Sequence, residues 1–396
     1  MLDESKYPVR VLQVVSLQKS DYYFENLVDQ CDRLAVEFTV ATLAGEGTFA
    51  TALRKRRITV YCLGCGKRSE YVKAVRLVCG IIRRHNVDVV HSHLVEPTWI
   101  GLTAARLTGR AAIITRHFSD VLYRIENPLK RWGHVRLEQW CRVLADHIIA
   151  PSTDVRRYLI NREGMDASRV TVIPHAQDSR RFEAVTDRNV ARVKKELGMD
   201  RTPSLVCVSR LDRWKGHVYL FQAVSVLKGE FPGLSLYLVG EGPYRAQLEK
   251  AAQDLGIAGW VRFLGFRGDA LDIMAAADVV VHPSLSEALS SVIIEAIALE
   301  KPVVASDVSG VRETIEGHGT LVPPADPDAL EQALRSTLAN LEAANRLAAG
   351  GRVQILESMA ASKVARAHVD IYGSVLARRS GSVARTVSLV GPGNVR

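Results

Sequence analysis

Short apolar runs rich in β-branched residues alternate with segments of helical spacing along most of the chain. Residues 9–15 (VRVLQVV) and 87–91 (VDVVH) are two such runs, and residues 70–85 and 97–108 have helical spacing. Continuous apolar strands that alternate with helices are typical of a parallel sheet covered on both faces. The pattern predicts further strands in this half at 36–42, 58–63, 111–115, 147–150 and 170–173.

The pattern restarts after a charged helix predicted at 187–197. Strands are expected in the second half at 204–209, 234–239, 260–264, 278–281 and 302–305, and helices at 216–229, 243–255, 269–276, 289–299, 310–316 and 326–347. The two halves together indicate an α/β protein of two Rossmann-like, doubly wound domains. Because ligands bind beyond the carboxyl ends of the strands in such sheets, we expect the site in an interdomain cleft that the two domains face.

On this pattern the chain divides into four parts. We expect an N-terminal domain at 1–180 and a C-terminal domain at 181–351, because 396 residues exceed what one ordinary core accommodates. A last helix at 352–376 is expected to pack back on the N-terminal domain. Residues 377–396 have no periodicity and are rich in Gly, Ser and Arg, which predicts a disordered tail.

The composition indicates a globular protein of the cytoplasm. It is 47% hydrophobic and 24% charged, and no run approaches the roughly 18 apolar residues that span a bilayer. The first ten residues, MLDESKYPVR, carry acids where a signal peptide has basic residues. The six cysteines are scattered, and the pair Cys62 and Cys65 lacks a second pair to form a zinc ribbon, which favours loop thiols in a reducing compartment.

Positive charge is concentrated in the first half of the chain. The net charge is +9, and residues 1–180 hold 27 Lys and Arg against 19 Asp and Glu, including the basic run at 54–57. This indicates either a solvated basic surface or an anionic partner such as a phospholipid surface, a lipid diphosphate or a nucleic acid. Basic residues do not alternate with aromatic ones as in RNA-binding sites. We therefore expect no nucleic-acid partner and consider peripheral contact with the inner face of an anionic membrane.

Two basic residues follow the strand predicted at 204–209. Arg210 and Lys215 would lie at the carboxyl end of this strand, and Gly216 opens the next helix. A planar guanidinium and a mobile ammonium at this edge suit a diphosphate, and they would neutralise the charge of a departing nucleoside diphosphate. From this segment alone, a pair of solvated loop cations explains the residues equally well.

A second group of candidates surrounds the helix predicted to begin near Leu289. Its first turn has free backbone N–H groups and the positive end of the helix dipole, with the hydroxyls of Ser290 and Ser291 beside them. Glu287 precedes the helix, and Glu295 lies about two turns into it among apolar residues. Carboxylates accept hydrogen bonds from vicinal diols, so this pair suits a sugar and a ribose. The structural alternatives are a helix-dipole charge for the first glutamate and a solvated face for the second.

The spacing of Glu287 and Glu295 resembles the E-x7-E motif of the retaining glycosyltransferases of family 4, which have the GT-B fold. Arg210 and Lys215 match the diphosphate-binding Arg and Lys of that family. The resemblance is strong over about 200–330 and weaker but continuous over 85–180. It rests further on the segments GEGP (240–243), VRFLGF (261–266), GVRE (310–313), LVPPADPDAL (321–330), DVVHSHL, ITRHF, ADHIIAPS and VTVIPHAQD.

The resemblance implies a donor site in the second domain and an acceptor site in the first. Arg210 and Lys215 would hold the diphosphate, together with backbone amides of residues 289–291. Glu295 would bind the ribose, and Glu287 the hydroxyls of the donor sugar. Because these cations and the helix terminus take the place of a metal, no metal or other cofactor is expected.

His117, in the segment ITRHFSD, matches a histidine that lies near the donor sugar in that family. It would orient the sugar or manage the acceptor proton, or else be a satisfied strand-end histidine. Arg116 and Asp120 are weaker candidates beside it. His91 and His93 point the same way on one strand, but no third metal ligand is identifiable, which favours cleft lining or packing.

Three segments depart from the family pattern. Residues 16–27 contain no glycine where many members have a Gly–Gly loop, and Lys19 or the tyrosines are candidates to replace it. The usual Asn–Gly near the interdomain link is His175–Ala176, and the Gly–Phe–Gly that often follows the first glutamate is ALS (288–290). The first two departures concern the acceptor and the identity of the donor rather than the class of enzyme.

The expected function is that of a retaining hexosyltransferase. It would move a hexose-type sugar from a UDP- or GDP-sugar to a glycan or lipid-linked acceptor in the synthesis of cell-surface polysaccharide, lipopolysaccharide or glycolipid. The alternatives are a GT-B-fold nucleotide-sugar epimerase and a non-catalytic nucleotide-sugar binding protein. A dehydrogenase is disfavoured because no G-x-G-x-x-G follows a strand.

Overall fold

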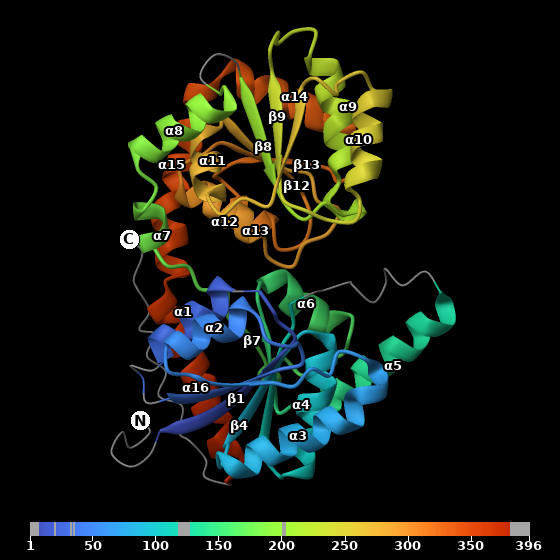
Figure 1. Ribbon diagram of the computed structural model, residues 1–396, viewed down its shortest axis with the longest axis vertical. Coiled ribbons are helices and arrows are strands. Elements are labelled where there is room, and N and C mark those ends of the chain that lie inside the picture. Colours follow the sequence, from blue (N-terminus) through green and yellow to red (C-terminus); the bar gives the residue numbers. More distant parts are fainter. Residues whose placement is uncertain are drawn as a thin grey trace, which may run out of the picture.

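The structure is a computed structural model, which describes residues 8–19, 21–31, 34, 36–117, 127–199 and 203–380. The chain forms two α/β domains, one above the other in Figure 1. In the described part of the chain, no helix is both long and apolar enough to cross a membrane. Of the tail predicted at 377–396, the first residues continue the last helix, and residues 381–396 lie outside the described residues.

The first domain is built on a seven-stranded parallel sheet in the order β3-β2-β1-β4-β5-β6-β7. Its strands are β1 (Val9–Val15), β2 (Val36–Thr42), β3 (Thr59–Cys62), β4 (Val89–His93), β5 (Ala111–Thr115), β6 (His147–Ala150) and β7 (Val170–Val172). Each lies within two residues of its predicted bounds. The central strands β1, β4, β5 and β6 are largely buried runs rich in apolar residues, whereas the edge strands β3 and β7 are partly exposed.

The second domain is built on a six-stranded parallel sheet in the order β10-β9-β8-β11-β12-β13. Its strands are β8 (Ser204–Val208), β9 (Ser235–Val239), β10 (Val261–Gly265), β11 (Val279–His282), β12 (Val303–Ser306) and β13 (Thr320–Val322). The first five match their predicted bounds within one residue. The sixth strand, β13, was not predicted. The two sheets confirm the expected α/β fold of two Rossmann-like domains.

Helices flank both sheets (Figure 1). The first domain has α1 (Tyr22–Cys31), α2 (Thr48–Lys55), α3 (Tyr71–Arg84), α4 (Val95–Leu107), α5 (Pro128–Leu144) and α6 (Thr153–Asn161). The second has α7 (Arg180–Glu183), α8 (Asp187–Leu197), α9 (His217–Leu227), α10 (Arg245–Asp254), α11 (Ala270–Ala276), α12 (Ser291–Ala298), α13 (Arg312–Ile315) and α14 (Pro327–Ala339).

The C-terminal helices differ from the prediction. The helix expected at 326–347 ends at Ala339, because Asn340 begins a new helix, α15 (Leu341–Ser358), by accepting a hydrogen bond of 3.2 Å from the backbone N–H of Ala343. The helix expected at 352–376 is also interrupted, since α16 (Ala361–Arg379) begins separately. At this break the carbonyl of Met359 accepts a hydrogen bond of 2.8 Å from the N–H of Gln177.

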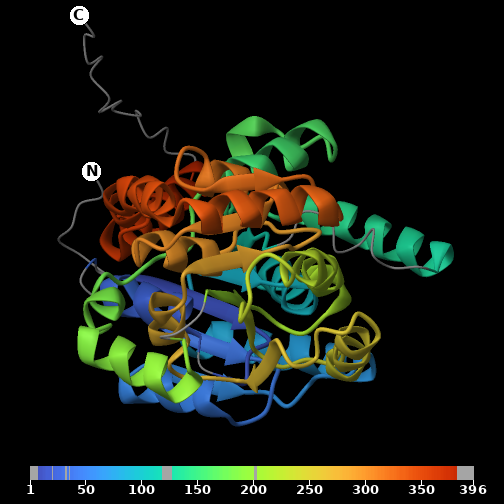
Figure 2. The ribbon, with the colours of Figure 1, turned by 90° about the horizontal axis from the view of Figure 1, so that it is seen from above.

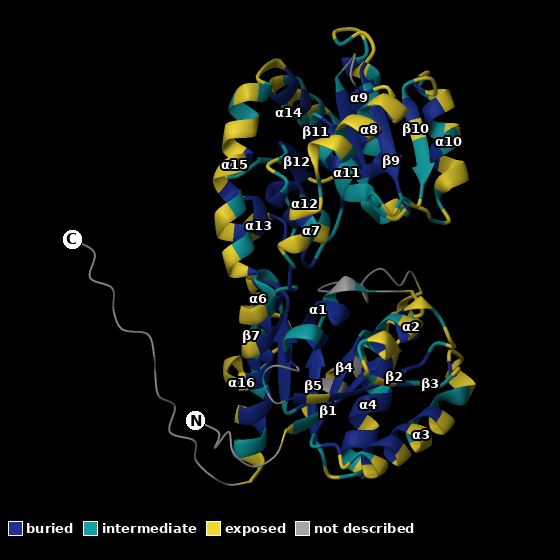
Figure 3. Cartoon of the chain, turned by 60° about the vertical axis from the view of Figure 1, so that its left-hand side comes forward, coloured by how far each residue is buried: buried dark blue, intermediate teal, exposed yellow. Residues whose placement is uncertain are grey.

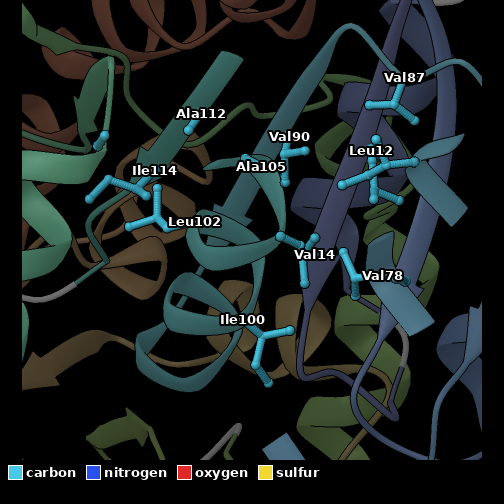
Figure 4. Close-up of a cluster of buried hydrophobic side chains, with 14 of the residues drawn as sticks. Leu12, Val14, Val78, Val87, Val90, Ile100, Leu102, Ala105, Ala112 and Ile114 are labelled. Carbon is cyan, nitrogen blue, oxygen red and sulfur yellow. The ribbon is translucent and has the colours of Figure 1, made fainter. Parts of the chain in front are cut away.

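Alternate residues of each strand enter opposite cores, as the period of a strand requires. In β1, Leu12 and Val14 join one buried cluster with residues of α3 and α4 (Figure 4), and Val11 and Val15 join the cluster on the other face. The second domain repeats this arrangement on the two faces of its own sheet. Each sheet is thereby fixed on both faces, and its strand ends are rigid supports for functional groups.

Helix α16 packs on the first domain although it follows the second in sequence. It lies against α1, and its residues Val364, Val369 and Tyr372 belong to the core of the first domain. Figure 3 shows α15 running beside the second domain and α16 continuing beside the first. The chain therefore passes between the domains twice, and a parallel bridge between Gln177 and Ala360 joins the two passages.

Candidate active site

Lys215 and Glu287 form an ion pair between two loops of the second domain. Lys215 ends a 3₁₀ turn (Arg213–Lys215) that follows β8, and Glu287 lies between β11 and α12. The ammonium group of Lys215 donates a hydrogen bond to Oε1 of Glu287, and Nε2 of His282 lies 2.8 Å from the same oxygen. The predicted cation and the first predicted carboxylate are thus in direct contact at the carboxyl ends of neighbouring strands.

The Glu287 carboxylate is ionised in this environment. Burial raises the pKa of Glu287, but the hydrogen bond to His282 and the charge of Lys215 outweigh it and lower the pKa to about 2. The two side chains are only 26% and 13% exposed, which excludes a solvated loop cation for Lys215. The pair offers a ligand one positive and one negative group side by side.

Backbone contacts hold the two loops together. Gly216 has a φ of +68°, and a Cβ on it would lie 1.9 Å from the carbonyl oxygen of Pro283. The N–H of Leu285 donates a hydrogen bond of 2.8 Å to the carbonyl of Trp214. Only glycine combines this left-handed conformation with so close an approach, so the glycine fixes Lys215 against Glu287.

Arg210 lies in the loop after β8 and is exposed. The loop is paired with the GEGP segment: the N–H of Ser209 donates 3.0 Å to Val239, and the N–H of Leu211 donates 3.0 Å to Glu241. Within the described residues Arg210 forms no ion pair. Its guanidinium is therefore accessible both to solvent and to an anionic ligand, and its role in binding a diphosphate stays a prediction.

The next three predicted residues, at 289–291, lie at the start of α12, which begins at Ser291, and they differ in surroundings. Ser290 caps the helix by accepting from the N–H of Ile293 at 3.4 Å, and its hydroxyl lies 3.2 Å from Nε2 of His282. The side chain of Leu289 is buried in the core, so only its backbone can serve a ligand. Ser291 is exposed and lines the interdomain cavity.

Glu295 pairs with an arginine that sequence reasoning did not identify. Arg181 of α7 donates a hydrogen bond of 3.0 Å to Oε1 of Glu295, whose side chain is 15% exposed. Burial raises the pKa of Glu295, and the charge of Arg181 opposes the shift. A solvated face is therefore excluded for this glutamate. The sequence feature that could have pointed to Arg181 is its position directly after the link between the two domains.

A cavity of about 340 Å³ lies between the two domains. It brings together three predicted residues, His117 of the first domain and Ser291 and Glu295 of the second. Arg210, Lys215 and Glu287 are not part of its lining. The other lining residues are Val15, Leu17, Asp21, Tyr23, Phe24, His93, Leu94, His175, Ala176, Gln177 and Arg181.

His117 belongs to a hydrogen-bonded chain that enters the first domain. Its Nε2 lies 3.1 Å from Nδ1 of His93, whose Nε2 lies 2.7 Å from Oε1 of Gln13. Burial lowers the pKa of His117 to about 3, and the neighbouring His175 adds to the shift. The imidazole is therefore neutral near pH 7, and His117 would meet a ligand in the cavity as an uncharged hydrogen-bonding group.

His91 and His93 are packing and cleft-lining residues, as favoured above over a metal pair. Nδ1 of His91 lies 2.9 Å from the Tyr372 hydroxyl and its Nε2 lies 2.8 Å from the Thr115 hydroxyl, so both ring nitrogens have protein partners. Among the described residues, no group of three or more His, Cys, Asp or Glu side chains is placed to hold a metal ion. Cys62 and Cys65 are free thiols.

Part of the loop that lacks glycine contributes to the cavity. Tyr23 lines the cavity, and its hydroxyl lies 3.1 Å from Nε2 of His368 in α16. Lys19 instead lies over the ring of Phe266 in the second domain, 5.7 Å from the centroid. Of the weaker candidates beside His117, Arg116 pairs with Glu163 at 3.4 Å, and Asp120 lies outside the described residues.

The sequence matches known glycosyltransferases over both domains. The family described as "Glycosyltransferase Family 4" matches residues 21–181, and "Glycosyl transferases group 1" matches residues 190–354. A D-inositol 3-phosphate glycosyltransferase of Corynebacterium jeikeium is 35% identical over 347 residues, which are 79% of this chain and 81% of the relative. A GDP-mannose-dependent alpha-(1-6)-phosphatidylinositol monomannoside mannosyltransferase of Mycolicibacterium smegmatis is 30% identical over 70% of this chain and 74% of the relative.

Solved structures share the two-domain fold. HepE of Anabaena, in complex with UDP-glucose, superposes with a TM-score of 0.80 at 22% identity over 92% of this chain and 99% of that chain. The lipopolysaccharide glycosyltransferase WaaG superposes with a TM-score of 0.73 at 17% identity over 91% and 99%. The chain therefore belongs to glycosyltransferase family 4, has the GT-B fold, and is a glycosyltransferase.

Proposed function

We propose that the protein transfers a hexose-type sugar from a UDP- or GDP-sugar to a glycan or lipid-linked acceptor, with retention of the anomeric configuration. The observation that carries the proposal is the Lys215–Glu287 ion pair at the carboxyl ends of β8 and β11. Arg210, which is exposed, lies in the loop that follows β8, and Glu295 of α12 lines the interdomain cavity. A diphosphate, its ribose and its sugar together require such a set of groups.

The proposed roles follow from charge. Lys215 and Arg210 bind the diphosphate and stabilise the negative charge that develops on it as the glycosidic bond breaks. The ionised carboxylate of Glu287 accepts hydrogen bonds from hydroxyls of the donor sugar, and Glu295 accepts from the ribose diol. Both carboxylates already have protein partners, so donor hydroxyls share or replace those partners when the ligand binds.

The neutral His117 orients the acceptor or the sugar from the opposite side of the cavity. In the proposed retaining reaction the acceptor attacks from the face that the diphosphate leaves, and the departing phosphate receives the acceptor proton. The cations and the start of α12 supply the positive field for this step, so the proposal includes no metal or other cofactor.

Support for the donor class comes from related proteins. A fold neighbour has been solved with UDP-glucose, and a relative is described as GDP-mannose-dependent. Other relatives act in lipopolysaccharide core synthesis and on an inositol phosphate. We therefore place the proposed acceptor among cell-surface glycans and lipid-linked saccharides.

The test is an incubation of the protein with a panel of UDP- and GDP-sugars, with and without lipid and oligosaccharide acceptors. Release of UDP or GDP that depends on an acceptor, with a product of unchanged anomeric configuration by NMR, supports the proposal. Interconversion of the nucleotide-sugar without an acceptor indicates an epimerase, and binding without turnover indicates a non-catalytic protein; either result contradicts it.

Variants of the proposed site sharpen this test. Lys215→Ala should lower kcat by roughly 100- to 1,000-fold, the range for loss of one charge-stabilising group. Glu295→Ala should instead raise the donor KM by about tenfold or more, because it removes a hydrogen bond to a charged group. Lys250→Ala is the matched control, since Lys250 on α10 is 74% exposed and pairs with Asp254 one turn away. Equal kinetics in Lys215→Ala and the control would exclude the proposed site.

A further inference from the structure

Hydrogen bonds connect His117 at the interdomain cavity to the last helix of the chain. Nε2 of His117 lies 3.1 Å from Nδ1 of His93, and Nε2 of His93 lies 2.7 Å from Oε1 of Gln13. Nε2 of Gln13 donates to the hydroxyl of Tyr372 in α16 at 3.2 Å. Figures 1 and 2 show the red C-terminal helix beside the blue first strands. Gln13, His93 and Tyr372 are buried, so the connection is shielded from solvent.

The histidines of this connection are neutral. Burial lowers the pKa values of His91 and His93 well below the ordinary value, and it lowers the pKa of His117 to about 3. In a neutral imidazole one ring nitrogen carries a hydrogen and donates, and the other accepts. The role of one nitrogen therefore fixes the role of the other. Along a chain of such rings, the direction of one hydrogen bond determines the direction of the next.

Gln13 sets the direction at the end nearest the cavity. Its Oε1 can only accept, so His93 carries a hydrogen on Nε2 and donates it to Gln13. Nδ1 of His93 is then an acceptor, and His117 donates to it from Nε2. Nδ1 of His117 is left without a hydrogen. Because His117 lines the cavity, this lone pair is the one that the ring can offer to a ligand.

The opposite end of the connection gives the same direction independently. Nδ1 of His368 in α16 lies 2.8 Å from the backbone carbonyl of Val364, which can only accept. Burial lowers the pKa of His368 to about 4, so the ring is neutral and its Nε2 accepts. The hydroxyl of Tyr23 lies 3.1 Å from that nitrogen and donates its hydrogen to it. Burial raises the pKa of Tyr23, and a hydrogen bond from Thr115 to the Tyr23 oxygen opposes the rise.

Two further hydrogen bonds join Thr115 to Gln13. Because Thr115 gives its hydrogen to Tyr23, it accepts from Nε2 of His91 at 2.8 Å. Nδ1 of His91 then accepts from the hydroxyl of Tyr372 at 2.9 Å. Tyr372 has no second hydrogen, so it accepts from Gln13, as the amide of Gln13 requires. The two ends therefore agree on one direction for every bond.

We propose that Gln13 and Tyr372 are positioning residues that hold His117 in the tautomer with a hydrogen on Nε2 and a lone pair on Nδ1. The tautomer of an imidazole is set by the hydrogen bond of its far nitrogen. The opposite tautomer would reverse every bond of the chain and leave a lone pair of His368 facing the carbonyl of Val364. Two buried acceptors in contact are unfavourable, so the network selects one tautomer.

The selected tautomer determines what His117 can bind, and this consequence rests on the proposed function. The lone pair on Nδ1 accepts a hydrogen bond from a hydroxyl of the donor sugar or of the acceptor. It cannot donate to a phosphate or a carbonyl oxygen. Helix α16 follows the donor-binding domain in sequence, yet it supplies the hydroxyl of Tyr372 that supports this histidine of the first domain.

The test is the tautomer of His117 in the full chain, measured by NMR from the couplings between ring protons and nitrogens of nitrogen-15-labelled histidine near pH 7. The variant His117→Gln identifies the signals of His117 by their loss. We expect wild type to carry the hydrogen on Nε2 alone. Gln13→Met keeps the length of the side chain but removes its acceptor, so His117 should populate both tautomers.

Tyr372→Phe tests the contribution of α16 to the same chain. Without the hydroxyl, the amide of Gln13 is free to turn, and a second tautomer of His117 should appear. Tyr237→Phe is the matched control, because Tyr237 is also fully buried and its hydroxyl donates 2.9 Å to the carbonyl of Leu197 in the second domain. It removes one buried hydroxyl and should leave the tautomer of His117 unchanged. Circular dichroism checks that every variant is folded.

Kinetics give a measurement that a purely structural role would not move. With a nucleotide-sugar and an acceptor, kcat/KM of Gln13→Met should fall by the fraction of molecules in the wrong tautomer, about twofold for equal populations. Tyr372→Phe should follow the same relation between tautomer fraction and kcat/KM. Tyr237→Phe should have the kcat/KM of wild type.

Two results would overturn the proposal. One is wild-type His117 with its hydrogen on Nδ1, or with a mixture of tautomers. The other is a single, unchanged tautomer in both Gln13→Met and Tyr372→Phe. A tautomer that changes as expected in a protein without transferase activity supports the positioning role and contradicts the proposed function, so the two proposals fail separately.

Discussion

Arg181 donates a hydrogen bond of 3.0 Å to Glu295, and this contact joins the passage between the domains to the helix that borders the cavity. Both side chains are mostly buried, at 21% and 15% exposure. A buried carboxylate without a counter-charge would be unfavourable, so the arginine stabilises the ionised form of Glu295. The contact therefore links the stability of the interdomain region to the charge state of a proposed ligand-binding group.

Loss of Arg181 should destabilise the protein. We expect Arg181→Ala to lower the free energy of unfolding by about 1–3 kcal/mol, because it leaves Glu295 buried without its partner. The neighbouring Arg180 is the control, since its side chain is 70% exposed in its pair with Asp178. Arg180→Ala should change stability by less than about 1 kcal/mol. Urea unfolding of both variants checks this, and equal losses would contradict the structural role of the Arg181 contact.

The Glu287 carboxylate should make stability depend on acid pH. Its folded-state pKa of about 2 lies below its ordinary value of 4.5, so its contribution is complete above about pH 5 and is lost as pH falls toward 2. In wild type this group should account for roughly 2 kcal/mol of lost stability between pH 6 and pH 3. Glu287→Gln should lack that part of the pH dependence. Urea unfolding at the two pH values measures it, and parallel curves for the two proteins would exclude the lowered pKa.

The buried histidines should destabilise the fold below neutral pH. Burial lowers the pKa of His368 to about 4 and that of His175 to about 4. Their folded-state pKa values lie below the unfolded value near 6.5, so the unfolded chain binds more protons and stability falls as pH decreases from about 6.5 to 4. Between pH 7 and pH 5, the free energy of unfolding of His368→Gln should fall by roughly 2 kcal/mol less than that of wild type. The measurement is the change in free energy of unfolding between the two pH values. A loss of stability that is the same at both pH values does not alter this change.

A glycine substitution can separate backbone strain from the loop contact beside Lys215. Gly198 and Gly216 have nearly the same φ, +71° and +68°, but nothing lies within 4 Å of a Cβ at Gly198. Gly198→Ala should therefore show only the strain of the left-handed conformation, about 1 kcal/mol. Gly216→Ala should be about 1–3 kcal/mol less stable than Gly198→Ala, because its Cβ would contact the Pro283 carbonyl. Equal thermal unfolding of the two variants would contradict the tight loop contact.

All the described strands except β13 were predictable, because they lie in short runs rich in β-branched and other apolar residues. Residues 111–115 and 147–150 form strands with the predicted bounds, and the helix predicted at 187–197 also has its predicted bounds. The helix break at Met359 was not visible in the sequence, because a hydrogen bond from Gln177 determines it. Contacts between distant segments override local pattern at such points.

The site residues were predictable as chemical types but their partners were not. The E-x7-E spacing selected both glutamates as candidates, yet the partner of Glu295 is 114 residues away and no spacing rule connects the two. The alternation of His91 and His93 correctly placed both rings on one side of β4, 4.2 Å apart. It could not show that the hydroxyl of Tyr372 in α16 would form a hydrogen bond with Nδ1 of His91, because that contact depends on where the last helix packs.

The return of α16 to the first domain has a consequence for the order in which the protein is completed during synthesis. The core of the first domain includes Val369 and Tyr372, which leave the ribosome after every strand of the second domain. The sheet of the second domain ends at Val322 and is available earlier. The domain that is translated first is therefore the one that is finished last, and a chain that stops before α16 has a complete second sheet beside a first domain with one face of its core open.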